Sequence, residues 1–423
     1  MIAIKNGRII TPDEVIDSKT LLIENDRIIS ITGEKVSADK VINAHGRYVM
    51  PGFIDVHSDK IEQFIYPRPT AKFPFELALK ECEKELLQLG ITTIYHSFSL
   101  YKDELLGKSP LRNKESVLKM ANLIEDIQSR FHLIHHRFHL RLEIDNVDGY
   151  DIAKDMIKRH LIHEISFMDH TPGQGQYRNL EVYRDTVDKY NGMENEGKTF
   201  DEVMEYHKTK DTLSFEQLKE LAEMAQENGI TVASHDDDTE EKLKLNKKLG
   251  VNISEFPITE ETAKTAHEMG FYTVAGAPNI LLGGSHSGNM SAANAIENNS
   301  VDILCSDYFP QALLHSLFVM CEKYGQKLPD MVNKVSLNPA KAMGIDKDYG
   351  SLEAGKKADI VIADILDGYP VVTHVLVDGK PLRGWNTGGS HYEYTYNQQS
   401  WETVLYASCK PHDPFLRKYK FYA

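Results

Sequence analysis

The sequence has few cysteines and no long apolar run. Of its 423 residues four are cysteines, which are scattered along the chain and form no C-x-x-C pair. This spacing favours neither a disulfide framework nor a thiolate zinc site. No apolar stretch approaches the roughly 18 residues that span a bilayer, and the first residues, MIAIKNGRII, lack the apolar segment of a signal peptide. We therefore expect a cytoplasmic protein without a membrane partner.

A surplus of basic residues is also missing. The chain carries 48 Lys and Arg against 63 Asp and Glu, which gives a formal net charge of −15. A general nucleic-acid-binding protein needs a basic surface, so we expect no nucleic-acid partner. An anionic small molecule is not excluded, because local charges and a metal ion can dominate a single site. The 18 histidines are many for this length, and several stand beside carboxylates at predicted strand ends.

The middle of the chain alternates predicted strands with predicted helices. One helical stretch, SFEQLKELAEMAQENG, has Ser214 and Gln217 in capping-box spacing and Gly229 at its end. Such alternation over about 300 residues predicts a parallel α/β fold. No G-x-G-x-x-G follows the first strand, which argues against a dinucleotide-binding sheet, and the number of strands favours a (β/α)8 barrel. The eight strand candidates are PGFIDVHSD, ITTIYHSFS, FHLRLEID, HEISFMDH, ITVASHDDD, VNISEFPIT, FYTVAGAPN and VDILCSDY.

Short strands are predicted on both sides of the barrel segment. The first 50 residues are typical of antiparallel strands with tight turns, and ADIVIADI and VVTHVLVDGKPLR repeat this pattern near the C-terminus. We expect residues 1–50 and 350–385 to form one small β-sandwich domain, with the catalytic barrel at 51–349; two separate β appendages are the alternative. Residues 386–423 are expected to form an aromatic-rich extension that packs on the domain or on a second subunit of a homo-oligomer.

Strand alternation predicts a group of polar side chains on the inner rim of the barrel. Alternate residues of a barrel strand point inward, and such barrels hold their active sites at the carboxyl ends of the strands. On this basis Phe53, Asp55, His57 and Asp59 share the inner face of the first strand. Converging carboxylates repel one another, whereas histidine with carboxylate is a normal ligand set for zinc, iron or manganese. The predicted ligands of one or two divalent metal ions are His57, Asp59, Glu143, His170, His235 and Asp307.

These residues stand in motifs that resemble those of a known family. The stretch MPGFIDVHSD, the barrel with flanking β segments, and the ending SLNPAKAMG…GSLEAGKKADIVIAD are similar to the amidohydrolase superfamily. Most members carry H-x-H on the first strand, whereas this chain has H-x-D, His57 and Asp59, as in the dipeptidase branch. The resemblance implies that Glu143 is a bridging carboxylate and that Asp307 is the last-strand aspartate, which would act as general base.

A closer resemblance covers nearly the whole chain. The stretches HSDKIEQFIYPRP, FMDHTPGQGQYRN, ASHDDDT, GAPNILLGGSHSGNMSA and CSDYFPQALL look like those of the metal-dependent hydrolases of the carbon–phosphorus lyase pathway. This resemblance implies hydrolysis of α-D-ribose 1-methylphosphonate 5-triphosphate to the 5-phosphate and pyrophosphate in phosphonate catabolism. Glycine-rich loops offer backbone N–H groups to anions, and polar side chains beside them add further donors. The predicted residues that bind the phosphorylated ribose are Arg68, Gln174, Gln176, Arg178, Gly284, Ser285, His286, Ser287 and Asn289.

Two other functions stay open. An amidohydrolase that acts on a C–N bond, such as a deacetylase, a dipeptidase or a cyclic amidase, would use the same metal site. A non-catalytic anion-binding scaffold on the same barrel would be expected to have lost metal ligands, and none is missing here apart from the H-x-D variation.

Five further positions carry weaker expectations. His135 and His136 precede the third predicted strand, so a solvated approach to that strand is expected there. His139 lies deeper on the inward face and is expected to be a buried hydrogen-bonding residue. Asp237 is a candidate partner that orients a ligand histidine, and Glu255 either lines the pocket or fills the barrel.

Overall fold

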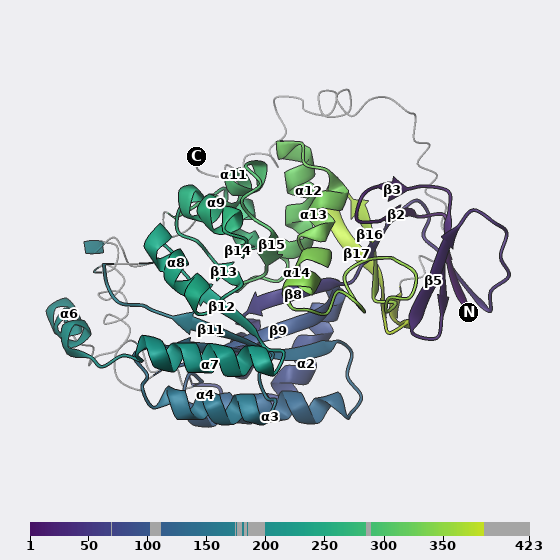
Figure 1. Ribbon diagram of the computed structural model, residues 1–423. Coiled ribbons are helices and arrows are strands. Elements are labelled where there is room, and N and C mark those ends of the chain that lie inside the picture. Colours follow the sequence, from purple (N-terminus) through teal and green to yellow (C-terminus); the bar gives the residue numbers. More distant parts are fainter. Residues whose placement is uncertain are drawn as a thin grey trace. The chain divides into compact units, whose positions relative to one another are not determined.

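Eight parallel strands, each followed in the chain by at least one helix, form the centre of the fold (Figure 1). The structure, a computed structural model, describes residues 1–68, 70–101, 111–173, 175, 180, 181, 184, 199–284 and 289–384. The strands pair in chain order, and the first meets the last, because the Asp307 N–H donates to the His57 carbonyl at 3.0 Å. The sheet therefore closes into the predicted (β/α)8 barrel. Its strands are β8 (Phe53–Ser58), β9 (Ile91–Leu100), β10 (His135–Glu143), β11 (Glu164–Met168), β12 (Thr231–His235), β13 (Ile253–Glu255), β14 (Tyr272–Gly276) and β15 (Ile303–Cys305).

Helices cover the outside of the barrel, and their apolar faces form the largest core with the outward side chains of the strands (Figure 1). The predicted capping box is present, since Ser214 Oγ accepts the Gln217 N–H and the Gln217 side chain accepts the Ser214 N–H. None of the helices that the structure describes is long and apolar enough to cross a membrane. The helices are α1 (Lys60–Ile65), α2 (Phe75–Gln88), α3 (Lys114–Gln128), α4 (Gly149–Lys158), α6 (Phe200–Thr209), α7 (Phe215–Glu227), α8 (Glu240–Lys248), α9 (Glu260–Glu268), α10 (Ala277–Leu282), α11 (Ala292–Glu297), α12 (Ala312–Tyr324), α13 (Leu328–Asn333) and α14 (Leu337–Ala342).

The first barrel strand departs from regular alternation. Phe53 packs in the outer core with the helices, whereas Ile54 and Val56 lie in the inner core of the barrel. The prediction that Phe53 and Asp55 share the inner face with His57 is therefore wrong. The pairing register between β8 and β9 shifts after Asp55, and such an irregularity re-aims the side chains that follow it. This shift explains why His57 faces the interior although it directly follows Val56.

Strands from both ends of the chain form two further sheets. In the six-stranded sheet, of order β18-β17-β16-β7-β2-β3, Ile360 of β16 lies opposite Pro51 of β7. The four-stranded sheet, of order β5-β4-β1-β6, contributes Ile4 and Leu21 to a core that also contains Ile362. The two ends therefore share one β structure, and they are not separate appendages. Its strands are β1 (Ile2–Lys5), β2 (Arg8–Ile10), β3 (Val15–Ile16), β4 (Thr20–Glu24), β5 (Arg27–Thr32), β6 (Lys40–Asn43), β7 (Tyr48–Pro51), β16 (Ile360–Leu366), β17 (Tyr369–Val377) and β18 (Lys380–Gly384).

The barrel and the terminal strands belong to one unit. Residues Met1–Gly384 group together by their internal contacts. The division into 1–50 with 350–385 and 51–349 stays a prediction, and the predicted extension 386–423 lies outside the described residues.

Candidate active site

A cavity of about 460 Å³ opens at the carboxyl ends of the barrel strands. This volume lies within the usual range of small-molecule sites. The sixth predicted metal ligand, Glu143, is 2% exposed and does not line the cavity. The other five predicted ligands line it: His57, Asp59, His170, His235 and Asp307.

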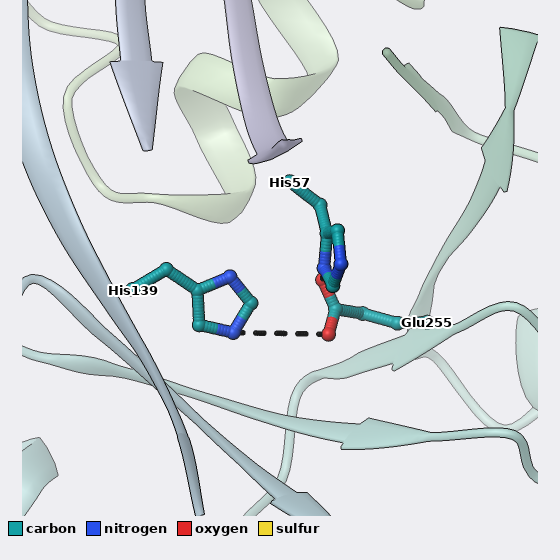
Figure 2. Close-up of side chains that lie close together, drawn as sticks. All are labelled: His57, His139 and Glu255. Atoms are coloured by element: carbon teal, nitrogen blue, oxygen red, sulfur yellow. Dashed lines mark hydrogen bonds and ion pairs between the residues drawn. The ribbon is translucent and has the colours of Figure 1, made fainter. Parts of the chain in front are cut away.

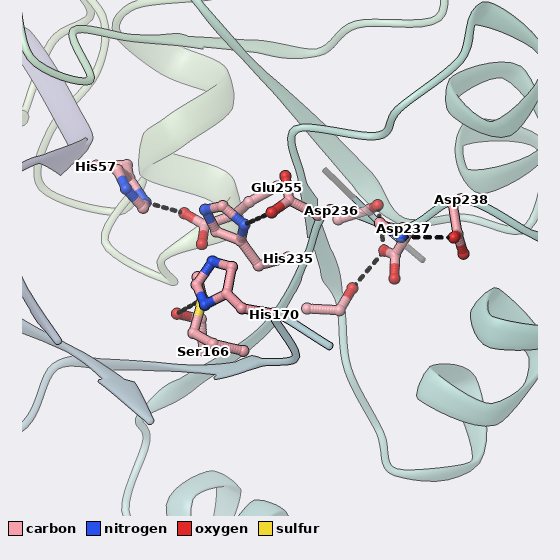
Figure 3. Close-up of polar contacts among 12 residues, drawn as sticks. His57, Ser166, His170, His235, Asp236, Asp237, Asp238 and Glu255 are labelled. Atoms are coloured by element: carbon pink, nitrogen blue, oxygen red, sulfur yellow. Dashed lines mark hydrogen bonds and ion pairs between the residues drawn. The ribbon is translucent and has the colours of Figure 1, made fainter. Parts of the chain in front are cut away.

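A buried carboxylate holds the first histidine from the far side of the barrel. His57 Nδ1 lies 2.8 Å from Glu255 Oε1 (Figure 3), so the imidazole donates from Nδ1 and leaves Nε2 free to bind a metal. Figure 2 shows both side chains together with His139, whose ion pair with Glu255 is dashed there. Burial lowers the pKa of His57, and the positive charge of Arg141 lowers it further, which keeps the ring neutral. His139 Nε2 is 3.8 Å from Glu255 Oε2, but it is engaged at 2.9 Å by the Ser166 hydroxyl. His139 is thus the buried hydrogen-bonding residue that was expected.

Each of the two later histidines also has a carboxylate beside it. His170 Nδ1 lies 2.8 Å from Glu143 Oε1, so Glu143 orients this histidine, and its role as a bridging carboxylate stays a prediction. His235 Nδ1 lies 2.9 Å from Asp236 Oδ2 (Figure 3). Burial by itself would raise the pKa of Asp236, but the neighbouring His235 outweighs it and the pKa is lowered. The carboxylates therefore fix the orientation of the rings at the cavity wall.

Asp307 stands where the barrel closes. Its backbone bridges β8, since its N–H donates to the His57 carbonyl and its own carbonyl accepts the Asp59 N–H at 3.0 Å. Its φ of +56° is uncommon for a residue with a side chain, and such strain occurs preferentially at functional sites. Burial raises the pKa of Asp307 to about 7, and the nearby Asp59 carboxylate adds to the shift.

The residues fit a divalent metal centre. Burial raises the pKa of Asp59 and, to about 7, that of Asp307, and the positive charge of Arg141 does not offset this effect. His235 is buried, and its Nε2 makes no hydrogen bond, while its Nδ1 faces the Asp236 carboxylate. A cation would satisfy both needs. The ligand atoms of the predicted metal site are not close together in this structure. Among the described residues of the site, only His57, His139 and Glu255 place three possible ligand atoms within 4.8 Å of one another.

The predicted substrate-binding residues divide into three groups. Asn289 lines the cavity, whereas Gly284 and the exposed Arg68 do not. The remaining six lie outside the described residues: Gln174, Gln176, Arg178, Ser285, His286 and Ser287.

Two of the weaker expectations are wrong. Strand β10 begins at His135, which pairs with Thr93, so His135 and His136 are buried and do not form a solvated approach. Asp237 turns away from the cavity, and its carboxylate accepts hydrogen bonds from Ser234, Ser254 and Asn246. The neighbour that reaches the ligand histidine is Asp236, because its left-handed φ of +53° interrupts the alternation.

Arginines in the cavity wall are absent from the predicted site. Arg112 and Arg141 both line the cavity. Strand alternation could have predicted Arg141, because it falls on the inward face of β10. Arg112 follows a loop, and no pattern in its local sequence predicts that it reaches the cavity. Tyr101 and Tyr308 also line the cavity and follow barrel strands β9 and β15.

Comparison with known proteins places this arrangement in a family. The amidohydrolase family profile matches residues 48–385. The α-D-ribose 1-methylphosphonate 5-triphosphate diphosphatase of Escherichia coli K12 is 32% identical over 381 residues, which cover 89% of this chain and 99% of that protein. The 5-methylthioadenosine/S-adenosylhomocysteine deaminase 1 of Archaeoglobus fulgidus is 22% identical over 400 residues, 89% of this chain and 88% of that protein.

Solved structures share the fold at low identity. N-acetylglucosamine-6-phosphate deacetylase from Pasteurella multocida superposes with a TM-score of 0.59 and 14% identity, over 90% of this chain and all of that one. A Xaa-Pro dipeptidase with bound methionine gives 0.62 and 15% over the same shares. The family match covers most of the chain and the E. coli relative aligns along nearly its full length, so this protein belongs to the amidohydrolase family.

Proposed function

We propose that this protein is a metal-dependent hydrolase that cleaves α-D-ribose 1-methylphosphonate 5-triphosphate to the 5-phosphate and pyrophosphate. The observation that carries the proposal is the 32% identity, over almost the full length of both chains, with the E. coli protein named for that activity. The cavity supports it, because histidines and carboxylates suited to a metal lie beside arginines suited to phosphoryl groups.

A bound divalent ion, such as zinc, iron or manganese, would activate water and offset charge on the phosphoryl oxygens. His57, His170 and His235, with Asp59 and Asp307, are the residues that would hold one or two such ions. Glu255 and Glu143 keep His57 and His170 in the orientation that leaves their Nε2 atoms available.

Asp307 is the proposed general base. Its carboxyl lies in the cavity, where it can accept a proton from water and return it. In the reaction the water oxygen bonds to the α-phosphorus, the bond from that phosphorus to the bridging oxygen breaks, and pyrophosphate leaves. The water proton passes to Asp307. Asn289 at the cavity wall and the predicted loop residues after β11 and α10 would hold the rest of the substrate.

A C–N hydrolase is the second candidate. Its specific support is that the A. fulgidus relative is named a deaminase and that two neighbours in fold are named a deacetylase and a dipeptidase. Those proteins are 22% identical or less, so the phosphoric anhydride is the better-supported bond.

The decisive experiment measures metal content and product release in one preparation. Purified protein is expected to contain divalent metal and to release pyrophosphate from the ribose 5-triphosphate, but to leave N-acyl and dipeptide substrates intact. D307N is expected to lose turnover by at least about a hundredfold, the lower range for a general base. Amide hydrolysis without pyrophosphate release would replace the proposal with the second candidate, and neither activity in a metal-loaded preparation would refute both.

A further inference from the structure

Arg141 is a cavity arginine without a partner. It lies on the inner face of β10 between His139 and Glu143, and its side chain lines the cavity. Across the described residues no hydrogen bond or ion pair involves its guanidinium, and its Nε is buried without an acceptor. A buried donor that lacks an acceptor destabilises the folded protein. The contacts within the protein therefore do not explain why an arginine stands at this position.

Arg112, the second arginine of the cavity wall, differs from Arg141 because it is paired within the protein. Arg112 is paired with the carboxylate of Glu62, with Nε 3.2 Å from Oε1 and Nη2 3.3 Å from Oε2. Its charge is therefore already compensated within the protein. Arg141 has no such carboxylate among the described residues, yet it lines the same cavity as Asp59 and Asp307. Arg141 therefore shares the cavity with the groups that would bind metal and move the proton.

Asp59 and Asp307 would not neutralise the charge of Arg141 in the metal-bound site. Asp59 and Asp307 are proposed to bind a divalent cation, which would take up their negative charge. The guanidinium cannot itself bind a cation, and it carries a planar set of five N–H donors. These donors match two oxygens of one phosphoryl group better than any neutral acceptor. The acceptor that Arg141 lacks must therefore arrive with the substrate.

We infer that Arg141 binds the phosphoryl group that is attacked, and not the remote end of the triphosphate. This inference rests on the proposed function and names a residue for it. The reacting phosphorus must lie beside Asp307, which takes the water proton, and Arg141 lines the same cavity as Asp307. Its paired N–H groups fix two non-bridging oxygens of that phosphoryl group and offset the charge that grows on them.

The test uses R141M and R141K in the metal-loaded enzyme, with R137M as matched control. Arg137 lies on the same strand and the same inward face, but four residues earlier and away from the cavity. The readouts are metal content, the affinity for inorganic phosphate from a ³¹P NMR titration, and separate kcat and KM values for pyrophosphate release. Inorganic phosphate is the probe because it chelates metal too weakly to strip the site.

R141M is expected to keep its metal, to bind phosphate about 10- to 100-fold more weakly, and to lose kcat by at least as much. R141K restores the charge without the planar fork, so its phosphate affinity should recover while kcat stays low. R137M should match the wild type. Unchanged phosphate affinity and kcat in both Arg141 variants would overturn the inference and leave the proposed function standing.

The failure of the proposed function gives a different pattern. The wild type would then release no pyrophosphate, while R141M would still bind phosphate more weakly than R137M. If R141M alone loses its metal or its fold, R141K decides: wild-type kcat in R141K excludes the paired contact, and a low kcat with full metal content supports it.

Discussion

Replacing Asp307 by asparagine is expected to stabilise the metal-free protein at alkaline pH. Burial raises the pKa of this carboxyl from 3.8 to about 7. In the folded protein it therefore stays protonated up to about pH 7, whereas in the unfolded chain it ionises above 3.8. Below 3.8 the two states bind the same proton and there is no penalty. As pH rises from there to about 7, the folded state loses stability relative to the unfolded state.

The size of the effect follows from the shift. A shift of about 3 units at 1.36 kcal/mol per unit gives up to about 4 kcal/mol at pH 8 and about 1.5 kcal/mol at pH 5. D307N removes the ionisable group, so its gain over the native sequence should grow by about 2–3 kcal/mol between these two pH values. Any constant effect of the amide cancels in this difference.

The assay is urea unfolding of chelator-treated protein at pH 5 and pH 8, followed by fluorescence. D13N is the control, because Asp13 is exposed and its substitution should give the same small shift at both pH values. Adding zinc or manganese should stabilise the native sequence strongly and D307N much less, since a ligand that binds only the folded state stabilises it. An equal shift of D307N at both pH values, or a loss that grows with pH, would refute the reasoning.

Three further substitutions test the supporting contacts. E255Q should weaken metal binding by about 10- to 100-fold in a chelator competition, because an uncharged amide polarises His57 less; native affinity would contradict this role. Burial by itself would lower the pKa of His135, but the Asp359 carboxylate 3.2 Å away outweighs it and the pKa is raised. That pair stabilises the fold fully below about pH 6.5 and is lost as pH rises through the higher folded pKa, so in urea H135Q should be destabilised at pH 6 and less so at pH 9. S214A should cost about 1 kcal/mol in the same assay through loss of the helix cap, at all pH values.

The barrel was predictable because its signals are local. Apolar runs of strand length recur along the middle of the chain, and capped helices such as the one that begins after Ser214 separate them. Each of these elements can be recognised from its own sequence alone. The composite β structure followed from the same strand pattern at both ends. Alternation also placed His139 in the interior, because β10 is regular over its length, with Phe138 and Leu140 in the outer core.

Alternation failed where the backbone is irregular. The register shifts after Phe53 and after Asp55 interrupt the alternation of the first strand, and the left-handed residue at Asp236 exchanges the roles of Asp236 and Asp237. Such local departures are set by contacts across the barrel and leave no mark in a single strand's pattern. The same limit applies to partners: Glu255 was a candidate pocket residue, but its contact with His57 joins two strands that are not neighbours in the sheet.

Residues with left-handed backbone conformation lie just beyond the ends of three barrel strands and determine how side chains point at the rim. Asp236, Phe256 and Asp307 all have φ near +55° without being glycine, and they follow β12, β13 and β15. Each such residue costs of the order of 1–3 kcal/mol, which must be recovered elsewhere. Phe256 shows why the cost is retained, since the centroid of its ring lies 5.0 Å from those of both His57 and His235. A glycine would relax the backbone but remove this packing from both imidazoles. The strain at the rim therefore fixes the orientation of side chains that a regular strand end would point elsewhere.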